Sequence, residues 1–208
     1  MKTRTYFLVA FSGLLIFLLT NCGGGGMKTS KNEFLGEIPS IQKYYHDKIG
    51  EIEKEIKTCT DINKAFKLDK EQQQLKEEWE AKIKESMNAN PLAAALPSEP
   101  INDPSLSVTK ISVTNVNTMG FGIKFAIKIN KDIKFDDKDL FIYYQAIDKD
   151  GKEIEGTKTK SLIRRDYGQE LKAGTDVEAT GAWSTKAICA MEDFAKIKFI
   201  SQTEFEKK

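Results

Sequence analysis

The sequence predicts an α+β protein, with a helical hairpin over residues 35–89 followed by an antiparallel β-sandwich over residues 105–208. In the first region apolar residues recur every three or four positions, which is the period of an amphipathic helix. In the second region they alternate with polar residues, which is the period of a half-buried strand. Four prolines fall between these regions, so a continuous helix is excluded and a stiff linker is expected over residues 90–104.

The chain begins with the pattern of an export signal. Lys2 and Arg4 precede an apolar run over residues 6–19, which is shorter than the about 20 residues that a membrane-spanning helix needs. A basic start followed by a short apolar core is typical of a secretory signal that is removed from the mature protein. We therefore assign residues 1–21 to a signal peptide.

The segment Leu19-Thr20-Asn21-Cys22 follows this core and resembles the bacterial lipoprotein box. The resemblance implies cleavage before Cys22 and a thioether from its sulfur to a diacylglycerol, so that the protein is anchored by lipid. Two or more acyl chains hold a protein stably at a membrane. The alternatives are an uncleaved anchor helix and a secreted protein with Cys22 in a disulfide.

Residues 22–34 are the expected tether, because the glycines at positions 23–26 leave the backbone flexible. In Gram-negative lipoproteins an Asp directly after the modified Cys can retain the protein at the inner membrane. This chain has Gly23 at that place. The resemblance therefore implies an anchor in the outer membrane, facing the periplasm.

Two helices are expected in the first region. One begins near Pro39, and its apolar seam consists of Tyr45, Ile49, Ile52, Ile56 and Cys59. The other covers residues 69–87, where Asp69 and Gln72 can form a capping box. Its seam consists of Leu75, Trp79, Ile83 and Met87.

The apolar residues between these helices are expected to pack into the helix crossing, and they are Ile62, Ala65, Phe66 and Leu68. Two short helices with matching seams most simply form an antiparallel hairpin. A homodimeric coiled coil and packing of the helices against the sandwich are the alternatives.

The second region contains about seven expected strands, a number typical of a sandwich. Alternation is strict at Phe121, Ile123, Phe125, Ile127 and Ile129. The other strands are expected at residues 106–116, 140–147, 153–160, 161–165, 175–184 and 196–205. A hairpin turn is expected at residues 148–151.

The segment Leu140-Phe-Ile-Tyr-Tyr-Gln-Ala-Ile-Asp148-Lys-Asp-Gly151, with Leu171-Lys-Ala-Gly174 after it, resembles a known kind of module. It is similar to the immunoglobulin-like sandwich modules of bacterial envelope lipoproteins, including the FxLYD type. In those modules an aromatic strand ends in an Asp-x-x-Gly turn, and a Leu-x-x-Gly turn comes later. The resemblance implies an immunoglobulin-like β-sandwich and a non-catalytic interaction or spacer role, and it transfers no catalytic residue.

The cysteines allow a disulfide. If Cys22 is acylated, Cys59 and Cys189 remain as an even pair in an oxidising compartment. A bond between them would join the helical region to the sandwich, and the alternative is two buried free thiols. Two cysteines and the single His46 cannot furnish a well-spaced zinc site, so no metal is expected.

Composition argues against several classes of function. The formal net charge of +1 becomes −1 once Lys2 and Arg4 are removed with the signal peptide. Nucleic-acid binding needs a concentrated basic face, and the near-neutral balance of mixed charges argues against it. The sequence carries no phosphate-binding glycine loop and no hydrolase signature such as Gly-x-Ser-x-Gly, so neither a cofactor nor a catalytic residue is expected.

Two features have binding character. Arg164 and Arg165 stand close to Tyr167 near the end of an expected strand, where they could hold an acidic or sugar ligand. Trp183 could supply a stacking platform for a glycan. The alternatives are a solvated turn for the first feature and core packing for Trp183.

These observations predict a membrane-anchored envelope lipoprotein that is not an enzyme. Its expected role is that of a protein-interaction or structural module with a partner in the envelope. One alternative is a glycan-binding lipoprotein, which requires Trp183 or Tyr167 to be exposed. A further alternative is an envelope hydrolase whose site is assembled from distant strands.

Overall fold

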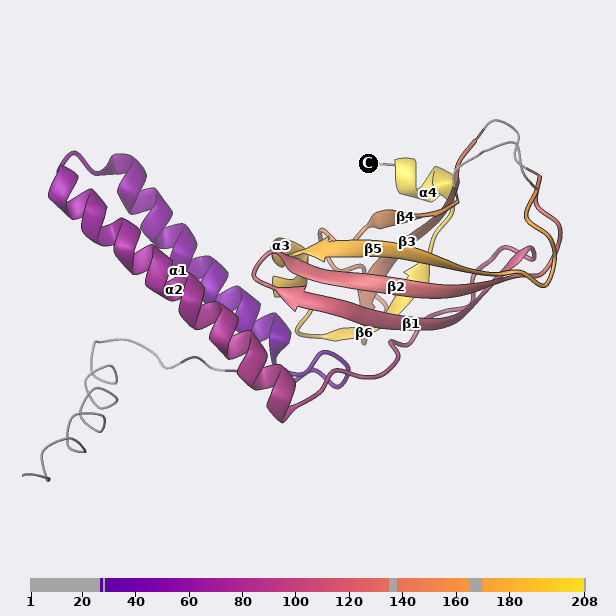
Figure 1. Cartoon of the computed structure of the whole chain (residues 1–208), viewed down its shortest axis with the longest axis horizontal. Coiled ribbons are helices and arrows are strands. Elements are labelled where there is room, and N and C mark those ends of the chain that lie inside the picture. The colour runs from indigo at the N-terminus through magenta and orange to yellow at the C-terminus, as the bar shows by residue number, and fades with distance from the viewer. Residues whose placement is uncertain (1–26, 28, 135–137, 165–169, 208) are drawn as a thin grey trace, which may run out of the picture.

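The computed structural model describes residues 27, 29–134, 138–164 and 170–207, and its fold is α+β as predicted (Figure 1). Two long helices are followed by an antiparallel sheet with two short helices beside it. The elements are α1 (Ile38–Thr58), α2 (Ile62–Ala89), β1 (Leu106–Asn117), β2 (Gly120–Ile129), β3 (Leu140–Asp148), β4 (Thr159–Arg164), β5 (Asp176–Ser184), α3 (Thr185–Cys189), β6 (Phe194–Phe199) and α4 (Gln202–Glu206).

The expected helical hairpin is present, but α2 begins earlier than predicted. The Asp61 carboxylate accepts hydrogen bonds from the backbone N–H groups of Asn63 (2.9 Å) and Lys64 (3.3 Å), so Asp61 is the N-cap. The capping box predicted at Asp69 is wrong, because Asp69 lies inside the helix. A single short turn at residues 59–61 therefore joins α1 to α2.

The two helices pack on each other and also on the sheet. Tyr45 of α1 stacks on Trp79 of α2, with ring centroids 6.1 Å apart. At the base of α1, Ile38 and Ile41 are buried in the same apolar cluster as Phe121 of β2. The hairpin and the sheet consequently share one hydrophobic core.

The strands form one curled sheet in the order β1-β2-β5-β4-β3-β6, with antiparallel neighbours. We expected the two separate sheets of a sandwich, and the described strands do not confirm them. A single register pair, Leu162 with Thr180, joins β4 to β5 and so connects two three-stranded halves. The halves curl toward each other as a half-barrel, and Phe125 of one packs on Tyr144 of the other at 4.7 Å (Figure 1).

A glycine allows the close approach of the two halves. The hydroxyl groups of Tyr144 and Ser161 lie 3.0 Å apart and are hydrogen-bonded beside Gly181. A Cβ atom at Gly181 would clash with both of these oxygens. The absent side chain therefore makes room for the buried polar pair that joins β3, β4 and β5.

The expected linker is extended but does not stand free of the sheet. Leu96 N–H donates to Ile111 C=O of β1 (2.8 Å), and Glu99 N–H donates to Ile197 C=O of β6 (2.8 Å). Ile197 N–H in turn donates to Pro97 C=O (2.9 Å). Because β1 and β6 are the two edge strands, the linker covers the open side of the half-barrel.

The shared core predicts that damage at the base of the hairpin destabilises the whole chain. Ile41→Ala should lower the free energy of unfolding by about 2–5 kcal/mol, because Ile41 is 1% exposed. The matched control Ile62→Ala removes the same atoms from a side chain that is 72% exposed, so its effect should stay within about 0.5 kcal/mol.

Urea denaturation followed both by far-UV circular dichroism and by tryptophan fluorescence checks this prediction. The two signals should change together in the parent chain. Separate transitions for helix content and fluorescence, or equal losses in the two variants, would contradict a core shared by hairpin and sheet.

Candidate functional site

The hairpin is an arm whose free end points away from the sheet (Figure 1). Its 21-residue first helix has a length of about 30 Å. The chain reaches the base of this helix close to the sheet, where the Asn32 side-chain amide donates to the carbonyls of Glu192 (3.1 Å) and Phe194 (2.8 Å). The incoming chain and the sheet thus lie at the same end of the hairpin, so the hairpin does not separate them as a spacer would.

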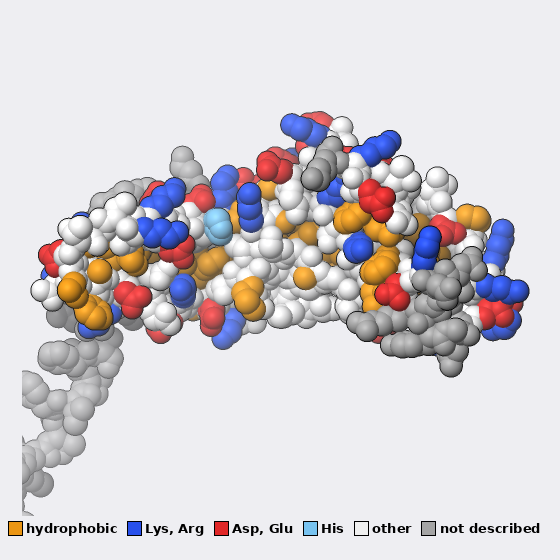
Figure 2. Space-filling view, turned by 90° about the horizontal axis from the view of Figure 1, so that it is seen from above, with side chains coloured by type: hydrophobic (Ala, Val, Ile, Leu, Met, Phe, Trp, Pro, Cys, Tyr) orange, Lys and Arg blue, Asp and Glu red, His pale blue; other side chains and the backbone are white. Residues whose placement is uncertain are grey.

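Two large apolar side chains are exposed at the free end, and we call Ile62 and Phe66 the tip patch. They are 72% and 65% exposed. Their spacing of four residues in α2 places them on one helix face. Figure 2 shows hydrophobic side chains among charged ones at this end of the hairpin. The prediction that these two residues pack into the helix crossing is wrong, whereas Leu68 is buried there.

Charged side chains of both signs surround the tip patch. Lys64 forms an ion pair with Glu55 across the two helices, with Nζ and Oε1 2.6 Å apart. This hydrogen bond to Glu55 raises the pKa of Lys64 above its ordinary value. Protein-binding surfaces combine apolar side chains at the centre with a polar rim, and the tip patch has this arrangement.

Trp183 does not provide the predicted glycan platform. It is 2% exposed, and its indole N–H donates to the carbonyl of Thr157 (2.6 Å). Its ring packs edge-on against Phe121 and Tyr144, with centroids 5.7 Å away from each. The alternative of core packing is the correct one, because Trp183 fills the space between the halves of the sheet.

Of the other predicted binding residues, the structure describes only Arg164. Arg164 is the last residue of β4 and is half-buried. Arg165 and Tyr167 lie outside the described residues, as do Cys22 and the rest of residues 1–26. His46 is exposed on α1, with Nδ1 3.6 Å from the Asp47 carboxylate. Within the described ranges, no three His, Cys, Asp or Glu side chains gather as a metal site.

The possible disulfide is not formed in the structure, in which Cys59 and Cys189 are both free. Cys59 ends α1 at the tip of the hairpin, whereas Cys189 lies in α3, which packs against α1 at the other end. Burial, followed by the nearby charge of Asp47, raises the pKa of Cys189 to about 11.

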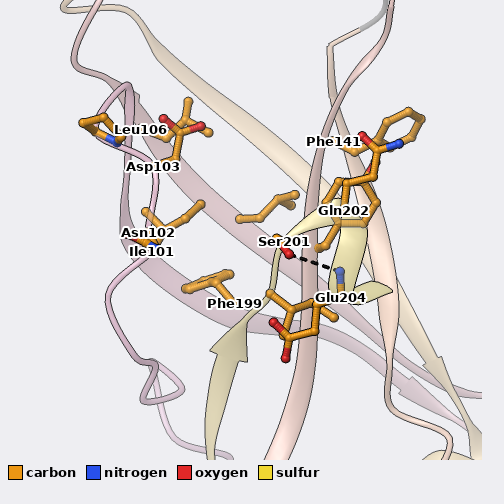
Figure 3. Close-up of a pocket in the computed structure, with 13 residues that line it drawn as sticks. Ile101, Asn102, Asp103, Leu106, Phe141, Phe199, Ser201, Gln202 and Glu204 are labelled. Carbon is orange, nitrogen blue, oxygen red and sulfur yellow. Dashed lines mark hydrogen bonds between the residues drawn. The ribbon is translucent and has the colours of Figure 1, made fainter. Parts of the chain in front are cut away.

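A cavity of about 480 Å³ opens on the sheet and its two short helices, which we call the head. We call this cavity the cleft, and the sequence analysis did not predict it. Its walls come from residues 101–104 on one side and residues 201–204 on the other, with Phe199 between them (Figure 3). Leu106, Phe141, Ile142, Tyr143 and Ile200 add further apolar surface to the lining. Three separate segments of the chain, within residues 101–106, 141–143 and 199–204, build this cleft, so no local motif could have indicated it.

Comparison with protein-family models, curated proteins and solved structures finds no match to this chain. In the part of the chain that the structure describes, no helix has both the length and the apolar character needed to cross a bilayer. Functional conclusions therefore rest on the residues and their geometry, with the tip patch and the cleft as the two candidate sites.

The thiols provide a direct test of this arrangement. Without reductant, a folded chain carrying Cys22→Ser should react at two thiols with dithionitrobenzoate, quickly at Cys59 and slowly at Cys189. The raised pKa keeps Cys189 protonated at neutral pH, and the thiolate is the reactive form. Single Cys59→Ser and Cys189→Ser variants assign the two phases. A chain that reacts only after reduction would contradict the free thiols.

Proposed function

We propose that this protein is an envelope lipoprotein, held in the outer membrane by acyl chains on Cys22, that acts as a non-catalytic interaction or structural module. The lipoprotein-box resemblance at residues 19–22 and the glycine tether after it support the anchor. The proposed partner is a protein of the envelope. No cofactor is part of the proposal.

The head is proposed to be related to immunoglobulin-like sandwich modules. The face-to-face packing of the two halves of the sheet supports this relation. The Asp-x-x-Gly turn supports it too, since the Asp148 carboxylate accepts N–H bonds from Asp150 (2.9 Å) and Lys152 (2.8 Å). Gly151 has a φ of 78°, a conformation that favours glycine at the end of such a turn.

The tip patch is the observation that carries the proposed interaction function. Ile62 and Phe66 are far more exposed than the apolar residues of a helix seam, and they sit at the end of an arm whose base is fixed in the core. A rigid arm loses little conformational entropy when a partner binds it. The buried Trp183 removes the main residue on which a glycan-binding function had been expected to rest.

The anchor is tested by Cys22→Ser in cells. The replaced residue has no thiol to acylate, so we expect loss of palmitate labelling, loss of signal cleavage and release from the membrane fraction. A serine variant at Cys59 controls for a general effect of removing a cysteine. Unchanged labelling and unchanged sedimentation in Cys22→Ser would overturn the lipoprotein assignment.

The interaction surface is tested by a photo-crosslinking residue in place of Asn63, which is exposed and directly follows Ile62 of the tip patch in the sequence. We expect a discrete crosslinked species in cells that is reduced at least fivefold by Ile62→Ser with Phe66→Ser, since central apolar anchors contribute more than about 1 kcal/mol each. Met119→Ser is the matched control, because Met119 is 79% exposed on the head.

Equal crosslinking in the tip and control variants would contradict docking through the tip patch. Circular dichroism of both variants shows whether the hairpin remains folded. The same cells, fractionated, separate loss of docking from loss of the anchor.

A further inference from the structure

At the cleft, the outer edge of β6 has backbone groups without a hydrogen-bond partner among the described residues. Ile197 of β6 directs its N–H and C=O outward to the linker, where Pro97 and Glu99 bind them. Strand alternation places the N–H and C=O of Phe199 on the same edge. The linker turns away after Glu99, and no described residue forms a hydrogen bond with these two groups of Phe199. An incoming strand would find a donor and an acceptor there.

The floor beside this edge is apolar. Leu106 is 4% exposed, Ile142 2% and Ile200 8%, so these side chains are fixed by the core below them. The side chain of Phe199 is half-buried and lies between the two walls of the cleft (Figure 3). Such a floor accepts one aliphatic or aromatic side chain from above without rearranging the head.

The rim of the cleft is acidic. None of its described lining residues is Lys, Arg or His, whereas Asp103 and Glu204 both line it. Glu204 has a counter-ion, since Lys198 Nζ lies 3.3 Å from its Oε1. Asp103 has no ion-pair partner among the described residues, and one of its oxygens is oriented by the N–H of Ser105 (2.8 Å). The rim therefore favours a cation and disfavours phosphate or carboxylate groups.

We propose that this cleft binds an extended peptide segment of a protein partner. Its backbone would pair with the N–H and C=O of Phe199, one apolar side chain would rest on the floor, and a Lys or Arg would pair with Asp103. This is strand addition at a sheet edge, in which the backbone bonds supply affinity and the side chains supply specificity. The inference deepens the proposed interaction function and uses neither the lipid nor the tip patch.

A phage-displayed library of random dodecapeptides, panned against the chain that begins at residue 22 and carries Cys22→Ser, tests this assignment. We expect enrichment of sequences in which Lys or Arg stands one or two positions from an aliphatic or aromatic residue. The enriched peptide, synthesised with a fluorescent label, should lose at least threefold in affinity for Asp103→Asn. Asp150→Asn, in the exposed turn of the head, is the matched control and should leave the affinity unchanged.

Amide hydrogen exchange locates the bound peptide. We expect slower exchange of the Phe199 N–H on binding and unchanged exchange at the tip of the hairpin. Selection of no sequence, selection of acidic sequences, equal affinities for the two Asp variants, or protection away from Phe199 would each overturn the peptide cleft. None of these outcomes bears on the anchor or the tip patch, whose tests are made in cells with other variants.

Discussion

The apolar contact between the base of the hairpin and the sheet is the constraint on which the rest of the structure depends. Most of the stability of a helix in a protein comes from packing of its apolar face, and α2 buries few of its own residues. Docking of Leu35, Ile38 and Ile41 into the core of the head supplies the burial that the helices lack. It also fixes the direction of the arm, so the position of the tip patch follows from contacts at the opposite end of α1.

This region also contains two buried polar atoms without a partner among the described residues, the Gln42 side-chain oxygen and the Trp79 indole N–H. Each such group costs about 1–3 kcal/mol. The nitrogen of the same Gln42 amide does have a partner, because it donates to the carbonyl of Asn117 at the end of β1 (2.8 Å). The apolar contact offsets the cost of the two unpartnered atoms, and the Gln42 bond ties the orientation of α1 to one particular strand end.

The features predictable from sequence were those encoded by local periodicity. The seams of both helices and the alternation in β2 depend only on neighbouring residues, so the hairpin and the sheet were predictable. The start of α2 was not, because Asp61 and Asp69 are both suitable caps and the choice between them depends on how tightly the chain turns after α1. Because the predicted start of α2 was too late, Ile62 and Phe66 were assigned to a segment between the helices and expected to pack into the helix crossing.

Features that depend on distant contacts could not be predicted. The single register pair between β4 and β5 decides whether six strands form one sheet or two, and no nearby residue pattern reports it. The position of Trp183 fits the alternation of side chains in β5. Which face of β5 is buried, however, depends on packing against Tyr144 and Phe121 from other strands. The cleft combines three segments that are far apart in the sequence, so its chemistry appears only once the chain has folded.

The linker also limits aggregation where many copies of the protein lie close together. Unpaired edge strands are templates on which neighbouring molecules can add strands and aggregate. Leu96 blocks part of the β1 edge, and residues 97–99 block part of the β6 edge, so one proline-rich segment protects both. Proline at positions 97 and 100 has no N–H to donate, so the outer side of this segment is itself a poor template for an added strand. Self-association through β-pairing is therefore restrained at both the β1 edge and the β6 edge.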